Sequence, residues 1–484
     1  MMKIKSFASI IFLLISILFL SATLSLCHHD HDHNLRQCRE RCEEKQQYQQ
    51  RRCLRDCQEK YGGTGWESTE EEKERSHEYN SRWEEEQQQQ QNNPYFFGEE
   101  SFKEWFRTQD GYFSVAQKFS EKSELLRGFD NYRLSFFEAN PRTFVVPSHI
   151  DAEYIFFVVK GRGTISLVSQ ETRETYNLER GDVIRVPAGT ILNVINKDSK
   201  EKLQFAELAQ SISIPGRIRD YIGMGGQNPE SFFNSFRGEV LEAAFNTPRG
   251  QIQRLFGQQK KGMMFQASEE QIRSISKQAS ESHQKRKGRS SGPFNLLKKS
   301  PLHSNRYGKL FQIDGNDYSQ LQDLDMSVTF TNITKGGMMA PFYNSKSTRF
   351  VMIVKGQGYF EMACVHYQRI SAQLRPRTAF IIPAGHPTTI VASKNENLQM
   401  VVFGINVRDN QKNFLAGREN VMNQMSKEAK ELGFNVQAKE VEEIFNQKES
   451  FFLPGPQQQQ QKQQREEGEA HHVLLSSIND FAGF

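Results

Sequence analysis

Several features that define specialised protein classes are missing from this sequence of 484 residues. Its 62 basic and 58 acidic side chains leave a net charge of only +4, which excludes a strongly basic nucleic-acid-binding protein. After the first 25 positions no apolar run approaches the length of a membrane-spanning helix, so we expect a soluble mature chain without a stable membrane association. A content of 37% hydrophobic and 11% aromatic residues excludes a wholly disordered chain or a collagen and allows a large core.

A targeting signal opens the chain. Two lysines precede an apolar run over residues 7–20, and small residues follow at positions 21–23 and 25. This layout predicts a secretory signal peptide over residues 1–25 and delivery into the secretory pathway. The alternative is a single membrane anchor, since the run is almost long enough to span a bilayer.

Four of the six cysteines form a regular pattern, with Cys38 four residues before Cys42 and Cys53 four residues before Cys57. Residues i and i+4 share one face of a helix, so two such helices packed antiparallel would form the nested disulfides Cys38–Cys57 and Cys42–Cys53. An oxidising compartment favours this pairing over the alternative, a zinc site with four thiolate ligands. We therefore expect a disulfide-linked α-hairpin module over residues 26–66.

Composition divides the rest of the chain. Residues 67–93 are rich in Glu and Gln and residues 456–484 in Gln, so neither segment can bury enough apolar surface to order itself. We interpret them as a linker and a C-terminal tail. Residues 282–292, which are basic and rich in Ser and Gly, form a second linker. Two long blocks, 94–281 and 293–455, lie between these segments.

The two blocks repeat one pattern. Residues 158–163 match residues 353–358, and residues 186–189 match residues 382–385, which indicates a duplicated domain because solenoid repeats are much shorter. Each block begins with short β-rich runs between Gly and Pro, typical of a sandwich or barrel, and ends in helical segments. The expected strands are 134–137, 154–159, 163–168, 183–186, 203–208, 328–333, 350–354, 359–363, 379–382 and 398–405. The expected helices are 229–245, 269–277, 416–432 and 438–445, with Ser268 and Gln271 as a capping box.

These motifs resemble those of a known family. Lys-Gly-x-Gly followed about twenty residues later by Pro-Ala-Gly is similar to the cupin pattern, a jelly-roll β-barrel. Two cupins in one secreted chain resemble the bicupin seed storage globulins, and residues 140–153, 242–248, 304–308 and 451–455 resemble their 7S, vicilin-like branch. The resemblance covers about residues 94–455. It implies a mainly β fold of two tandem cupin domains, each followed by a helical extension.

Enzymatic cupins bind Mn or Fe through three His and one Glu, and both blocks can be tested for this set. The four positions hold Pro147, His149, Tyr154 and Leu192 in the first block, and Phe342, Asn344, Arg349 and Thr388 in the second. One His among eight positions cannot hold the usual catalytic metal, so we expect no enzyme activity and a structural role for His149. A cupin oxidase or isomerase is the alternative, and stoichiometric Fe or Mn would revive it.

A different metal site is predicted in the second block. Cys364 and His366 share one face of an expected strand, and His386 follows the Pro-Ala-Gly turn that should reach the same barrel mouth. Thiolate and imidazole suit copper or zinc, and resemblance to copper-binding vicilins supports copper at these three residues. Tyr95, which precedes the first barrel, is a candidate fourth ligand. The alternative is a buried free cysteine beside two hydrogen-bonded histidines.

The resemblance implies a nutrient reservoir, a seed storage protein delivered to the protein storage vacuole and mobilised by proteases. The 43 Gln side chains fit a nitrogen store. The alternative is defence, because the cysteine hairpin resembles vicilin peptides released as antimicrobial or protease-inhibitory hairpins. Asn332 begins the only N-glycosylation sequon and lies in an expected strand. The family also implies a homotrimer built through the helical extensions, with the candidate contacts Phe414, Leu415, Val421, Leu432, Val441, Ile444 and Phe445.

Overall fold

The computed structural model describes residues 93–284, 292–364, 369–445 and 449–456, together with Cys38, Cys42, Cys53, Cys57 and Lys60. The predicted signal peptide lies outside these ranges, as do most of the two predicted linkers and nearly all of the C-terminal tail. The chain divides into two units, residues 1–86 and residues 87–484. Across the described ranges, no helix is both long and apolar enough to cross a membrane.

The first unit contains the predicted disulfides. Cys38 pairs with Cys57 across a Cα–Cα distance of 5.7 Å, and Cys42 pairs with Cys53 across 5.6 Å. All four cysteines lie in helical backbone. The nested pairing derived from the four-residue spacing is therefore confirmed.

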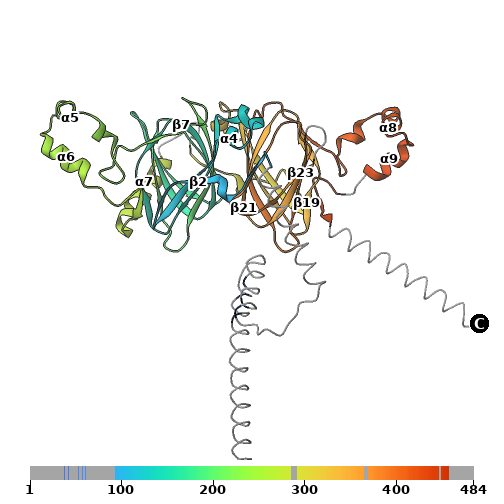
Figure 1. Cartoon of the computed structure of the whole chain (residues 1–484), viewed down its shortest axis with the longest axis horizontal. Helices are drawn as coiled ribbons and strands as arrows, with labels where there is room; N and C mark the ends of the chain where they lie inside the picture. The colour runs from blue at the N-terminus through green and yellow to red at the C-terminus, as the bar shows by residue number, and fades with distance from the viewer. Residues whose placement is uncertain are drawn as a thin grey trace, which may run out of the picture. The chain divides into compact units, whose positions relative to one another are not determined.

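The second unit contains two β-barrels, each made of two facing sheets (Figure 1). In the first barrel one sheet has the order β15-β10-β7-β12-β4-β3-β2 and the other β14-β5-β11-β8-β9, with β6 and β13 paired beside them. The strands are β2 (Phe102–Thr108), β3 (Gly111–Ala116), β4 (Tyr132–Ala139), β5 (Thr143–Val145), β6 (His149–Ile150), β7 (Ala152–Lys160), β8 (Arg162–Val168), β9 (Arg173–Glu179), β10 (Asp182–Val186), β11 (Ile191–Asn196), β12 (Leu203–Ser211), β13 (Asp220–Tyr221) and β14 (Met264–Gln266).

The second barrel repeats this arrangement. One sheet has the order β1-β24-β21-β26-β18-β17-β16, and the other β23-β22-β25-β19-β28, with β20 and β27 attached to it. The strands are β16 (His303–Asn305), β17 (Gly308–Ile313), β18 (Met326–Ile333), β19 (Gly337–Met339), β20 (Phe342–Asn344), β21 (Thr348–Lys355), β22 (Gly358–Ala363), β23 (Arg369–Leu374), β24 (Ala379–Ile382), β25 (Thr388–Ala392), β26 (Leu398–Ile405), β27 (Lys412–Phe414) and β28 (Phe452–Pro454).

The barrels exchange their outermost strands. Strand β1 (Phe96–Phe97) precedes the first barrel but pairs antiparallel with β24 of the second, with Phe96 opposite Phe380. Strand β15 (Phe294–Asn295) precedes the second barrel but pairs with β10 of the first, with Asn295 opposite Asp182. Each exchanged strand covers an edge whose backbone groups would otherwise be unpaired. The exchange therefore ties the two barrels together.

A continuous apolar core also spans both barrels. Side chains alternate across a strand, so one face of each large sheet lines its own barrel and the other is free to pack on the neighbouring barrel. Phe157 of β7 stacks on Phe330 of β18 at a centroid distance of 5.8 Å. Phe119 likewise stacks on Phe350 at 5.5 Å. All four rings are buried. Burial on this scale makes the two barrels one packed body.

Helices follow each barrel as predicted, but two of the expected helices are wrong in extent. Residues 229–245 contain a 3-10 turn (Phe232–Ser235) and α5 (Gly238–Phe245), and residues 416–432 contain a 3-10 turn (Val421–Gln424) and most of α8 (Lys427–Phe434). Ser231 and Asn420 cap the two turns with their side chains, and these local hydrogen bonds replace a continuous helix. The other helices are α4 (Phe119–Lys122), α6 (Arg249–Gly257), α7 (Glu269–Gln284) and α9 (Ala438–Phe445).

The predicted capping box at the start of α7 is confirmed. Ser268 Oγ accepts the Gln271 backbone N–H at 3.2 Å, and Gln271 Oε1 accepts the Ser268 backbone N–H at 2.9 Å. The two bonds satisfy two backbone donors at the helix N-terminus. Helix α7 then packs on the first barrel, where Ser276 Oγ lies 3.2 Å from Thr164 Oγ1.

Candidate functional sites in the two barrels

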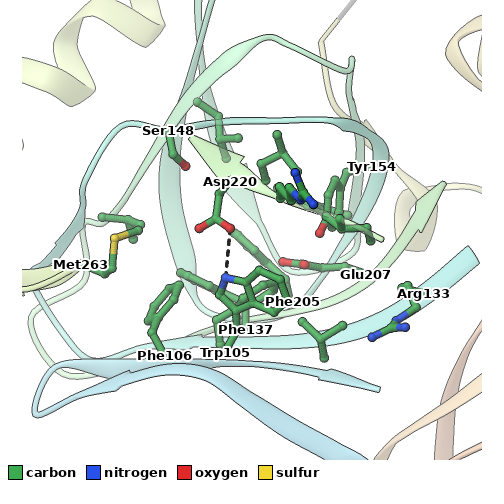
Figure 2. Close-up of a pocket in the computed structure, with 18 of the residues that line it drawn as sticks. Trp105, Phe106, Arg133, Phe137, Ser148, Tyr154, Phe205, Glu207, Asp220 and Met263 are labelled. Atoms are coloured by element: carbon green, nitrogen blue, oxygen red, sulfur yellow. Dashed lines mark hydrogen bonds between the residues drawn. The ribbon is translucent and has the colours of Figure 1, made fainter. Parts of the chain in front are cut away.

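The first barrel encloses a cavity of about 400 Å³. Its wall is largely aromatic and aliphatic, with Phe106, Phe137, Phe205 and Met263 around it (Figure 2). Trp105 Nε1 donates a 2.9 Å hydrogen bond to Asp220 Oδ1 within the wall (Figure 2). An apolar cavity with a few polar groups is the form of a small-molecule pocket.

Glu207 is the buried acid of this cavity. It lies at the centre of β12, opposite Phe156 of β7, and Ser135 Oγ donates a 2.7 Å hydrogen bond to its carboxyl group. Burial raises the pKa of Glu207 to about 8, because no described cation forms an ion pair with it. The carboxyl is therefore protonated at neutral pH and below. The sequence signal for it is a single acid inside the apolar run of residues 203–208.

Tyr154 occupies one of the tested metal positions and lies near Glu207 (Figure 2). Burial, and then the charge of Glu207, raises the pKa of Tyr154 well above its ordinary value. The neighbouring tested position, His149, stacks on Tyr221 at a centroid distance of 5.0 Å. That contact fits the structural role expected for His149, and no set of imidazole and carboxylate ligands surrounds it among the described residues.

The second barrel is nearly filled, with a cavity of about 30 Å³. The tested metal positions Phe342, Asn344, Arg349 and Thr388 are all buried. Burial lowers the pKa of Arg349 to about 10, and burial together with the Arg349 charge lowers the pKa of Lys412 to about 7. This barrel therefore has a basic interior. The sequence signal of this basic interior is Arg349, an arginine within the apolar strand β21.

The predicted copper ligands lie at one edge of the second barrel. Tyr95 is brought there by the exchanged strand β1, and its ring meets the His386 ring edge-on at a centroid distance of 5.8 Å. Burial, and then the charge of Cys364, raises the pKa of Tyr95. His386 Nδ1 lies 3.1 Å from the Ala384 carbonyl oxygen, which leaves Nε2 to face a metal if Nδ1 carries the proton. His366 lies outside the described residues.

A thiol, an imidazole and a phenol are the described donor types at this edge, and these types suit copper. Burial raises the pKa of the Cys364 thiol and so favours its neutral form, whereas a cation bound at the sulfur would favour the thiolate. A thiolate with imidazole and phenol oxygen would hold copper and supply a redox-active or storage centre.

The predicted glycosylation site, Asn332, lies in the middle of β18, between β17 and β26. Glycosylation of Asn332 stays a prediction.

The candidate trimer contacts in and beside the helical extensions differ in how far they are buried. Phe414 and Val441 are buried within their own chain, because Phe414 packs on Phe342 and Phe451 while Val441 lies on the inner face of α9. Leu432 and Ile444 remain 86% and 65% exposed. The free apolar surface of α8 and α9 is therefore smaller than the sequence suggested.

Comparisons with known proteins agree with this architecture. The cupin family matches residues 133–252 and 294–442, one stretch in each barrel. A protein of Macadamia integrifolia named "Vicilin-like antimicrobial peptides 2-3" is 44% identical over 92% of this chain and 75% of its own length. A vicilin of Corylus avellana is 44% identical over 88% of this chain and 96% of its own length.

Solved structures give the same result. The crystal structure of Corylus avellana vicilin has a TM-score of 0.71 at 46% identity and covers 75% of this chain and 100% of that one. A structure of Solanum melongena vicilin, described as showing "different anionic ligands in structurally similar pockets", has a TM-score of 0.72 at 41% identity and covers 75% of this chain and 99% of that one. Two cupin barrels, matched sequences and matched structures together show that this chain belongs to the vicilin family of 7S seed storage globulins.

Proposed function

We propose that this protein is a nitrogen and amino-acid reservoir of the seed, held in the protein storage vacuole and mobilised by proteolysis. One observation carries the proposal. At the metal positions of enzymatic cupins both barrels place buried packing residues, such as Tyr154 and Phe342, instead of a ligand set. The barrels thus serve as durable scaffolds without cupin chemistry, and the 43 Gln side chains add nitrogen.

The reservoir role is tested in seeds. Immunoblots with an antibody against the purified chain would follow its amount through seed maturation and germination. We expect accumulation during maturation and loss during germination, in step with the rise of free amino acids. A constant amount through germination would contradict the proposal.

We infer that the helical extensions join three copies in a ring. Figure 1 shows α5 and α6 at one end of the two barrels and α8 and α9 at the other. Apolar side chains are exposed at both ends, including Leu255 (67%) and Leu432 (86%). Unlike surfaces that meet head to tail close into a ring when the rotation permits. Leu255→Glu and Leu432→Glu should each give monomers in light scattering, whereas Leu125→Glu, at an equally exposed site on η2 (Glu124–Phe129), should not.

We infer that copper binds through Cys364, His366, His386 and Tyr95. The edge-on packing of the Tyr95 ring on the His386 ring supports it, as does the effect of Cys364 on the pKa of Tyr95. Metal analysis of protein purified without chelator should give close to one copper per chain for the wild type and for His149→Ala, and none for Cys364→Ala. Copper retained by Cys364→Ala would overturn the site.

A second candidate function is defence by a released hairpin. The two nested disulfides favour it, because they would keep a short peptide folded after cleavage. Digestion with seed proteases should release a disulfide-linked fragment that contains Cys38 to Cys57 and inhibits a trypsin-like protease or microbial growth. A fragment that does neither would leave storage as the sole role.

A further inference from the structure

A short strap returns the chain from the second helical extension to its barrel. The strap, residues 449–456, follows α9 and includes β28, which pairs with β19 at the edge of its sheet. Asn305 at the end of β16 holds it, because its Nδ2 donates to the Ser450 carbonyl at 3.1 Å and to the Phe452 carbonyl at 2.8 Å. The strap is thus bound to the barrel by backbone pairing on one side and by a side chain on the other.

Phe451 has an unfavourable backbone conformation within the strap. Its φ is +65°, in the left-handed region that bulky side chains rarely adopt. Its carbonyl accepts the Ala340 N–H at 2.7 Å, and directly after it the Phe452 N–H donates to the Ser450 carbonyl at 2.7 Å. A conformation of this kind persists only while the surrounding contacts hold it. The strap can therefore relax once a contact of Phe451 is lost.

Two aromatic side chains hold the Phe451 ring. His303 of β16 stacks on it at a centroid distance of 3.5 Å, and Phe414 of β27 meets it edge-on at 4.7 Å. Of these two partners only the imidazole can gain a proton and a charge. We call the stack of His303 on Phe451 the latch of the strap.

Positive charge acts on the latch from the neighbouring strands. Burial, and then the charge of Lys412 on β27, lowers the pKa of His303 to about 4. The charge of Arg349 on β21 acts in turn on Lys412. A proton on the imidazole would add a third cation to this partly buried region. The closed latch and a protonated His303 therefore oppose each other.

No carboxylate offsets these cations among the residues that the structure describes. Leu310, which lies opposite His303 in the register of β16 and β17, is uncharged. Glu449 is the acid of the strap, and it forms an ion pair with Arg306 at 3.0 Å. A proton is therefore bound more tightly when His303 is released into water than when the latch is closed.

The first barrel has no such latch at the equivalent place. Its closing strand β14 pairs with β5 as β28 pairs with β19. Met263 precedes β14, and its carbonyl accepts the Val146 N–H at 2.9 Å, as the Phe451 carbonyl accepts an N–H in the second barrel. Met263 has no titratable group, and its φ is not in the left-handed region. Strand β14 is therefore an internal control for the strap.

We propose that the latch is a pH-sensitive switch, in which protonation of His303 at acid pH breaks its stack on Phe451 and frees residues 449–456 from the second barrel. The freed strap is open to proteases, so acidification would begin the mobilisation of the chain at this end. That second step rests on the proposed storage function, whereas the opening of the latch does not.

Hydrogen exchange measured by mass spectrometry on the full chain tests the opening. The pKa of His303 is about 4 in the closed latch, against 6.5 for an ordinary imidazole. Lowering the pH from 6 to 4.5 should therefore raise the opening constant of residues 449–456 about twentyfold, after correction for intrinsic exchange rates. His303→Phe keeps an aromatic ring in the stack and should lose this rise. His303→Gln should lose it too, whatever its opening at pH 6.

Two further variants sharpen the test. Lys412→Met should reduce the rise, because one cation near the imidazole is removed. His149→Gln changes the histidine that stacks on Tyr221 in the first barrel and should keep the full rise. The latch is overturned if His303→Phe and His303→Gln both keep the acid response, or if β14 opens in parallel with the strap, because the acid effect then belongs to the whole body.

A protease assay measures the consequence separately. An acid-active aspartic protease should cleave within residues 449–456 faster in the wild type than in His303→Phe at pH 4.5, with a smaller difference at pH 6. Faster opening without faster cleavage would contradict the part of the latch in mobilisation and leave the latch itself intact.

Discussion

In the first barrel Glu207 and Tyr154 face a cavity of about 400 Å³, whereas Val402 and Arg349 at the equivalent positions of the second face one of about 30 Å³. The strands around both cavities have the same order and register, with Tyr154 opposite Ala209 and Arg349 opposite Gly404. The outer faces of the large sheets keep one shared apolar core. A duplicated scaffold can therefore hold its packing constant while the inside of each copy takes on a different charge.

A substitution in the apolar core that the two barrels share should have the largest effect on the stability of the protein. Phe350 is fully buried, stacks on Phe119 and contacts Phe129 and Tyr132 from the first barrel. Phe350→Ala should destabilise the protein by about 3–5 kcal/mol. Calorimetry should show one transition at a lower temperature, because both barrels lose packing, while the exposed Phe236→Ala changes little. Independent melting of the second barrel alone would contradict a shared core.

Glu207 makes the first barrel sensitive to rising pH. Its pKa is raised from 4.5 to about 8, so between these values the folded chain keeps a proton that the unfolded chain releases. The free energy of unfolding of wild type relative to Glu207→Gln should therefore fall as pH rises from about 4.5 to 8, by about 2–4 kcal/mol. Urea denaturation at pH 5 and pH 8 measures it. An equal difference at both values would show that Glu207 is not buried as described.

Lys412 should give the second barrel the opposite dependence on pH. Its pKa is lowered from 10.5 to about 7, so between these values the unfolded chain holds a proton that the folded chain lacks. The free energy of unfolding of wild type relative to Lys412→Met should rise with pH from about 7 to 10. The same urea experiment at pH 7 and pH 9.5 checks the sign, and a decrease would refute the basic interior.

The smallest loss of stability is expected at helix α7, which packs against β9 and β8 of the first barrel. Ser268→Ala removes one bond of its capping box and should cost about 0.5–2 kcal/mol. Hydrogen exchange should show faster opening of α7 with β17 of the second barrel unchanged. Equal acceleration in both barrels would mean that the cap acts on the whole body.

Much of the fold could be predicted because it follows from local patterns. Alternating and apolar runs located the central strands of both barrels, and the four-residue cysteine spacing gave the disulfides. The exchanged strands could not be found this way, because Phe96–Phe97 is short and its partner Phe380 is almost three hundred positions away.

The candidate sites were only partly predictable, for a similar reason. Tyr95 was named only as a possible fourth ligand beside the three that the vicilin resemblance supports, and no local pattern links it to His386, on which its ring packs. Glu207 and Arg349 are each a charged residue within an apolar strand, but the role of each charge depends on the residues that face it in the folded barrel. Whether a buried charge faces a cation, a glycine or a cavity is decided by tertiary packing, which a local pattern does not contain.

Limited proteolysis of the folded chain tests most directly that the two barrels form one durable storage body. Trypsin should cut within Lys285-Arg286-Lys287, between the blocks. We predict that the two fragments then co-elute in gel filtration and melt together, because β1 and β15 are exchanged and the core is shared. Separation of the fragments under native conditions, or rapid digestion of either barrel, would contradict this structure of the reservoir.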